Sequence, residues 1–338
     1  MANTKSPPSL ILGLGLVSKD PSNVERHREL VAAARELNIK VLDTSRVYGG
    51  GLSEEFIGNE GLSSEFDIIT KARMGLIPGG ASKEGVLKSW KESEEALKAN
   101  KVKYYLLHVP DETTPIGETM EGIQALYLAG HFEKFGLSNF SSTQVQECYD
   151  YMTTHSYILP TVYQSIYSLS ARLSQTTLFP ILRKLNISIQ AYSCLGSGFL
   201  VRTPAQIRAG EGNFDRGTVL GKILQNMYGG QRYLGFLEGF GALVEEMGRG
   251  ETGVGVAYRW VVWHGGLDGG RGDQVVVGAS TARQLREAVK EIEKGPLEDW
   301  VVKRLDDMWK DVEDEAPENN FVTFAKLVKA GELSGATH

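Results

Sequence analysis

The sequence predicts an α/β protein folded as a (β/α)8 barrel, and three observations support this. Short apolar runs alternate with amphipathic helical stretches along most of the 338 residues, giving eight strand-then-helix units. Such alternation predicts a parallel sheet, and eight units are the number that closes a TIM barrel. A doubly wound nucleotide-binding sheet would need a GxGxxG motif after the first strand, but residues 13–18 (GLGLVS) supply only two of the three glycines.

The expected strands are short, apolar and rich in β-branched residues, as buried parallel strands are. Several end in a polar or ionisable side chain, which points to the carboxyl-terminal mouth of the barrel as the functional face. The expected strands are residues 9–15, 40–45, 66–72, 102–109, 135–139, 161–165, 187–193 and 274–278.

The helices are predicted from apolar residues spaced three and four apart and from capping residues. Residues 30–37 carry an i, i+3, i+4, i+7 apolar stripe, Ser82 is a candidate N-cap, and Pro115 suits a first helical turn. Pro180 should disturb the helix that contains it. A long irregular stretch, residues 196–232, follows the seventh strand. The expected helices are one that contains the stripe at residues 30–37, then residues 53–62, 82–99, 115–128, 142–151, 175–185, 233–247, 254–263, 281–293 and an extra C-terminal helix, 297–312.

Composition favours an ordinary soluble enzyme, expected as a single domain over residues 1–338 with its core at about 9–321. Hydrophobic residues make up 41% and charged residues 23%, and the net charge is −6. Without a Lys/Arg-rich block, a nucleic-acid partner is not expected, and no run approaches the ~20 apolar residues of a membrane helix. Only Cys148 and Cys194 are present, which favours a reducing, cytoplasmic location. The six histidines form no HExxH or CxxC cluster, so no metal is expected.

Four residues with useful chemistry fall at or just beyond three consecutive strand ends. Asp43 ends the second strand, Tyr48 follows it, Lys71 ends the third and His108 ends the fourth. Each of these residues alone has a structural explanation. An aspartate at a strand end is often a capping residue, a lysine is usually solvated, and a histidine is as often a hydrogen-bonded residue without a catalytic role. Together at one mouth they predict a catalytic site.

These four residue types suit the reduction of a carbonyl group. A carbonyl that accepts hydride develops negative charge on oxygen and needs a proton, which the phenol of Tyr48 can supply. The unperturbed pKa of tyrosine is ~10, and we expect the Lys71 ammonium to lower it while Asp43 holds the lysine. A neutral imidazole at His108 can bind and orient the substrate oxygen.

Seven motifs surround or follow these residues: LDTSRVYG (42–49), ITKAR (69–73), YYLLHVPD (104–111), GLSNF (136–140), PTVYQSIYS (160–168), QAYSCLGSGFL (190–200) and VVVGASTARQL (275–285). They resemble the motifs of the aldo-keto reductase superfamily, and the general layout looks most like the aflatoxin-aldehyde reductase branch. The likeness spans residues 9 to 321. It implies an NADPH-dependent enzyme that reduces an aldehyde or ketone to an alcohol, with Asp43, Tyr48, Lys71 and His108 as the catalytic tetrad and Tyr48 as proton donor.

The resemblance also implies contacts to the nicotinamide end of the cofactor. Ser138, Asn139 and Gln164 match the residues that bind its carboxamide, and Tyr192 matches the aromatic residue that stacks on its ring. Without the resemblance, a core aromatic is an equally good interpretation of Tyr192.

The phosphate groups of the cofactor are expected at the loops after the seventh and eighth strands, where barrels of this type commonly bind phosphate. Arg283, in the first turn of the following helix, could bind a 2′-phosphate, although a solvated helix residue is the alternative. Three residues depart from the family pattern. Cys194 stands where relatives usually have proline, and the lysine expected on the pyrophosphate side is missing or replaced by Arg202. Ala288 stands where relatives often carry an asparagine near the adenine. The expected phosphate-side residues are Gly196, Gly198, Arg202, Gly278, Ser280 and Arg283.

Arg46 is the residue that the reductase mechanism explains least. It lies between Asp43 and Tyr48, so an always-charged guanidinium at the pocket rim would join His108 in binding substrate and favour anionic carbonyl compounds. The alternative is that Arg46 points to solvent or pairs with Glu54 or Glu55.

Two other functions stay open on the same barrel. One is a regulatory or binding protein resembling the potassium-channel β-subunits, with weak or no turnover. The other is a metal-dependent hydrolase, which the lack of His/Asp ligand clusters disfavours. The expected partner is a small carbonyl substrate, with no nucleic acid and no membrane, and a homodimer stays open. The sequence does not name the physiological substrate.

Overall fold

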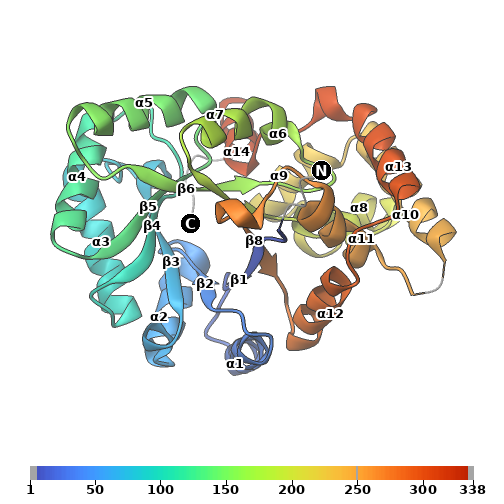
Figure 1. The fold of residues 1–338 in the computed structure, drawn as a ribbon, viewed down its shortest axis with the longest axis horizontal. Helices are drawn as coiled ribbons and strands as arrows, with labels where there is room; N and C mark the ends of the chain where they lie inside the picture. The colour runs from blue at the N-terminus through green and yellow to red at the C-terminus, as the bar shows by residue number, and fades with distance from the viewer. Residues whose placement is uncertain (1–5, 249, 334–338) are drawn as a thin grey trace.

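The expected (β/α)8 barrel is confirmed. The computed structural model describes residues 6–248 and 250–333, and in it parallel strands close into one barrel in the order β1 to β8. Figure 1 shows the helices arranged around the ring of strands. The strands are β1 (Ser9–Gly13), β2 (Val41–Asp43), β3 (Asp67–Ala72), β4 (Val102–Leu107), β5 (Phe132–Ser138), β6 (Pro160–Ile166), β7 (Ser188–Tyr192) and β8 (Gln274–Gly278).

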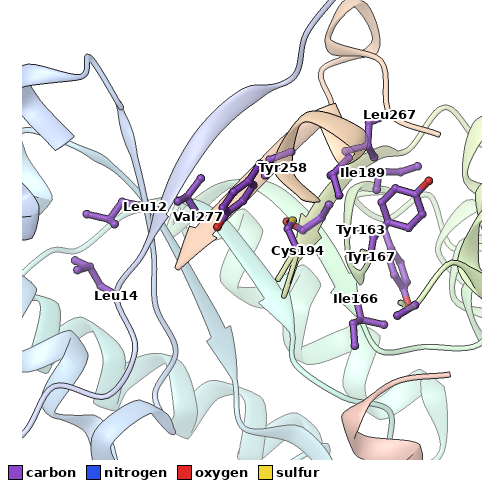
Figure 2. Packing of buried hydrophobic residues seen from close by; sticks show 14 of the residues in the cluster. Leu12, Leu14, Tyr163, Ile166, Tyr167, Ile189, Cys194, Tyr258, Leu267 and Val277 are labelled. Carbon is purple, nitrogen blue, oxygen red and sulfur yellow. The ribbon is translucent and has the colours of Figure 1, made fainter. Parts of the chain in front are cut away.

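The barrel is closed by β1, which pairs with β2 on one side and with β8 on the other. Ile11 is opposite both Val41 and Val276, and these three side chains belong to the apolar group inside the barrel. Alternate residues such as Leu12 and Val277 pack outward against the helices. Figure 2 shows part of that outer layer, in which Tyr258 lies next to Cys194 with Val277 on its other side.

Most helices begin and end close to the expected residues. Ser82 caps α3 by accepting a hydrogen bond from the Gly85 amide at 3.1 Å, as predicted, whereas Pro115 is the N-cap of α4 and precedes its first turn. The Pro180 segment is divided into two short helices. The helices are α1 (Pro21–Glu36), α2 (Leu52–Asn59), α3 (Lys83–Leu97), α4 (Ile116–Leu128), α5 (Ser142–Thr154), α6 (Leu173–Thr177), α7 (Phe179–Lys184), α10 (Gln231–Met247), α11 (Gly253–Arg259), α12 (Ala282–Glu293) and α13 (Asp299–Lys310).

One expectation about the later chain is wrong, and the chain also has one helix that was not expected. Residues 196–232 are not an irregular stretch, because they contain α8 (Pro204–Ala209) and α9 (Val219–Tyr228), each capped by a threonine side chain. A further helix, α14 (Asn320–Lys329), follows α13 and packs against α9. Within the described residues, no helix combines the length and the apolar character needed to cross a membrane.

Candidate active site

A buried ion pair forms the floor of the site. Asp43 ends β2, and Lys71 lies next to the end of β3 with 0% exposure. The Lys71 ammonium donates to both carboxylate oxygens of Asp43 at 2.9 and 2.8 Å and to the Thr44 carbonyl at 2.8 Å. Burial lowers the pKa of Lys71, while the Asp43 charge and hydrogen bond oppose this shift. The carboxyl-terminal ends of β2 and β3 therefore hold a buried lysine whose charge is balanced by an aspartate.

Tyr48 lies above this pair on a tight turn. It opens the 3₁₀ turn Tyr48–Gly51, in which Gly49 has φ +60° and a Cβ there would lie 2.3 Å from the Val17 carbonyl oxygen. The turn places the Tyr48 ring with its centroid 5.0 Å from Lys71 Nζ and 5.7 Å from the His108 ring, which it meets at 81°. The structure thus brings together all four members of the expected tetrad.

The expected effect of Lys71 on the phenol is not what the structure indicates. Burial is the main influence and the Asp43 charge the second, and both raise the pKa of Tyr48 above its usual value. The phenol is therefore protonated at neutral pH, which is the form that a proton donor needs. Burial and the nearby Lys71 charge hold the pKa of His108 well below its usual value, in agreement with the expected neutral imidazole.

The residues expected at the nicotinamide end form one hydrogen-bonded group beside the tetrad. Asn139 donates to the His108 carbonyl at 2.9 Å and to Ser138 Oγ at 3.0 Å, and Tyr192 donates to Asn139 Oδ1 at 2.7 Å. Gln164 donates to Asp43 Oδ2 at 2.8 Å. These contacts join the group to the ion pair, so both sets of side chains are fixed relative to each other.

The loop after β7 is compact and places several residues in the left-handed region of backbone conformation. Gly196 and Gly198 have φ +60° and +96°. Arg202 folds back on this loop, donating to the Gly198 carbonyl at 2.6 Å and lying 5.6 Å from the Phe214 ring centroid. The guanidinium therefore braces the loop from within.

The loop after β8 leads into a hollow of about 550 Å³ at the start of α12. Gly278 ends the strand, and the Ser280 amide donates to Gln284 Oε1 at 2.9 Å. The Arg283 side chain is 81% exposed, and its Nη1 lies 3.5 Å from Glu287 Oε1. Ala288 is buried in the core, so that departure from the family pattern faces the protein interior.

Arg46 adopts the alternative interpretation, pairing with Glu54. Its guanidinium is buried and donates to Glu54 Oε2 at 2.8 Å, with Glu55 at 3.8 Å. Thr70 donates to the other Glu54 oxygen at 2.5 Å. The charge of Arg46 is thus directed into the protein, which gives no support to its predicted role in binding anionic substrates.

Two residues at the site escaped the sequence analysis. Ser45 Oγ lies 3.0 Å from His108 Nδ1, and Phe321 of α14 meets the His108 ring at a centroid distance of 5.5 Å. Asn319, which caps α14 by accepting from two amides, was the available signal for that helix. Nothing in the sequence distinguished Ser45, because its partner is 63 residues away.

The sequence is also similar to known proteins along most of its length. The sequence model of the aldo/keto reductase family matches residues 9–310. The chain belongs to the aldo/keto reductase family. It is 42% identical to the oxidoreductase sirO of Leptosphaeria maculans over 297 residues, covering 88% of this chain and 89% of that protein. The family membership makes the chain an oxidoreductase of the carbonyl-reducing type.

The chain is also similar to aflatoxin B1 aldehyde reductases in sequence and to a glycerol dehydrogenase in fold. The chain is 32% identical to the rat aflatoxin B1 aldehyde reductase member 2, over 85% of this chain and 81% of that protein. It is also 32% identical to the human member 4, over 83% and 87%. The glycerol dehydrogenase of Gluconobacter oxydans superposes with a TM-score of 0.69 at 23% identity, over 91% and 96% of the two chains, which shows the shared fold.

Proposed function

We propose that this enzyme reduces an aldehyde or ketone to an alcohol with NADPH, and that Tyr48 donates the proton. The observation that carries the proposal is the convergence of Tyr48 and His108 above the buried Asp43–Lys71 pair. When bound, the dinucleotide supplies the hydride to the carbonyl carbon. The protonated phenol gives its proton to the carbonyl oxygen, with the buried Lys71 ammonium 5.0 Å from the centroid of the Tyr48 ring.

The chain's own residues fit a cofactor that ends in a carboxamide. Gln164 uses its side-chain nitrogen to donate to Asp43 and to Gln190, which leaves its Oε1 as an acceptor for an amide N–H. At the other end, the glycine turn after β7 and the exposed Arg283 suit phosphate groups. A small carbonyl substrate and a cytoplasmic location remain our predictions.

The test is NADPH oxidation with nitrobenzaldehyde, followed by absorbance, in the wild type and two variants. Tyr48→Phe should lower kcat by at least ~10²-fold, the lower range for general acid catalysis, with NADPH binding nearly intact by fluorescence titration. Tyr127→Phe, which removes the hydroxyl of an exposed tyrosine on α4, is the matched control. Unchanged turnover in Tyr48→Phe would overturn the assignment. Cofactor binding without turnover across aldehydes, ketones and quinones would favour the regulatory or binding alternative.

A further inference from the structure

Ser45 makes a buried hydrogen bond to the imidazole of His108. The serine is 0% exposed and the histidine 4%, and Ser45 Oγ lies 3.0 Å from His108 Nδ1. The Val47 amide also donates to Ser45 Oγ, at 3.4 Å. The Asn139 side chain donates to the backbone carbonyl of His108 at 2.9 Å. The ring is therefore held through both its backbone and its Nδ1 atom.

Counting donors and acceptors distinguishes the two neutral tautomers. If Ser45 donates its hydroxyl hydrogen to Nδ1, its oxygen still accepts from the Val47 amide, and every group in the contact is satisfied. If Nδ1 instead carries the proton and donates to Ser45, the serine oxygen receives two hydrogens. Its own hydroxyl hydrogen then has no acceptor among the described residues, and a buried donor without a partner is costly.

We propose that Ser45 is a positioning residue that holds His108 in the tautomer with its proton on Nε2. Nδ1 is then occupied as an acceptor, and Nε2–H is the donor available to the carbonyl oxygen of a substrate. The rings of Tyr48 and Phe321 meet His108 edge-on at 5.7 and 5.5 Å, so aromatic surfaces flank the ring on which this donor lies. The consequence for catalysis rests on the proposed function, whereas the tautomer itself does not.

The tautomer is measured directly on the wild-type enzyme. Two-dimensional ¹⁵N NMR of protein labelled at histidine separates protonated from unprotonated ring nitrogens, and the His108 signals are assigned by their loss in His108→Gln. We expect the protonated nitrogen to be Nε2 between pH 7 and 8. A proton on Nδ1, or an equal mixture of the two forms, would overturn the proposal. This measurement needs no turnover and no Ser45 variant.

Variants then show whether the serine is responsible. Ser45→Ala should produce a tautomer mixture and lower kcat/KM by about three- to tenfold, the size of one net hydrogen bond. Ser45→Thr keeps a hydroxyl and should keep the Nε2–H signature. The matched control is Ser53→Ala, because Ser53 is also fully buried but its hydroxyl has no partner among the described residues. A Ser45→Ala spectrum identical to the wild type would remove the serine's role. An Nε2–H signature in an enzyme that reduces no carbonyl compound would instead contradict the proposed function.

Discussion

At the scale of single residues, Arg46 shows how a charged side chain near a catalytic group can serve the loop that carries that group. Its guanidinium is bonded to Glu54, and a Cβ at Gly51 would lie 1.5 Å from Arg46 Nη2. The turn from Tyr48 to Gly51 is therefore folded closely over the arginine. Burial raises the pKa of Glu54, while the Thr70, Ser93 and Arg46 contacts oppose that rise.

Arg46→Ala should destabilise the protein by about 3–5 kcal/mol, because it leaves the Glu54 carboxylate buried without its partner. Unfolding in urea measures this. The matched control is Arg35→Ala, whose ion pair with Glu65 is half exposed and should contribute less than about 1 kcal/mol. Adding Glu54→Gln to Arg46→Ala should recover part of the loss. KM for succinic semialdehyde and for a neutral aldehyde should change alike. A rise confined to the anionic substrate would restore the anion-binding hypothesis.

The sequence reveals side-chain types at strand ends but not the contacts between distant residues. Asp43, Lys71 and His108 could be predicted because each ends an apolar run at the same mouth. The direction of Arg46 and the Ser45–His108 contact could not, since both depend on how the loop after β2 folds against other elements. The pKa of Tyr48 likewise depends on burial, which no local pattern gives.

At the scale of elements, the strands were easier to predict than the helices around the later loops. Buried parallel strands read as short apolar runs, and all eight were found. Between residues 196 and 232, repeated glycines dilute the helical pattern, and the capping residues Thr203 and Pro204 are the local signal for α8. Helix α14 was missed because its ten residues follow the end of the motifs that carried the resemblance.

The hollow at the start of α12 allows a matched test of cofactor choice. Two arginines line it: Arg286 is bonded to Glu36 at 2.8 Å, whereas Arg283 is largely exposed. Arg283→Ala should remove one or two charge-assisted hydrogen bonds to the 2′-phosphate. The free-energy preference for NADPH over NADH should therefore fall by about 1.5–3 kcal/mol for each bond lost. Arg286→Ala, with the same loss of charge, should keep the preference. The ratio of kcat/KM for the two cofactors measures both. The assignment of Arg283 fails if Arg283→Ala leaves this ratio unchanged, and Arg202 or Arg232 would then be the next candidates.

At the scale of the whole molecule, a chain of amide side chains runs through the barrel from the site to its other end. Gln164 contacts Asp43 and donates to Gln190 at 3.3 Å; Gln190 donates to Gln274 at 2.9 Å. Gln274 then donates to Ser9 at 3.1 Å. The barrel interior also holds an apolar group, formed by Ile11, Val41, Ile69, Tyr104, Leu106, Val162 and Val276. Polar groups in such an interior stabilise the fold only while all of them are paired.

Replacing one of two hydrogen-bonded glutamines should therefore lower the free energy of unfolding more than replacing both of them. Gln274→Leu leaves the Gln190 side-chain nitrogen without its acceptor, and Gln190→Leu leaves the Gln274 oxygen without its donor; each should cost about 1–3 kcal/mol. The double variant replaces both amides by apolar groups of similar size, which the neighbouring aliphatic side chains can accommodate. It should lose less than either single variant.

A double-mutant cycle of urea unfolding measures the coupling between the two glutamines. Gln146→Leu, which removes an exposed amide bonded to Asp150, is the control and should change the free energy of unfolding little. Additive losses in the double variant would mean that the two amides act independently and that the chain is not a unit. A coupling that exceeds the error of the cycle would instead show that the interior depends on the amides being paired. In that case the position of Gln164 against Asp43 would depend on hydrogen bonds that reach the opposite end of the barrel, through Gln190 and Gln274.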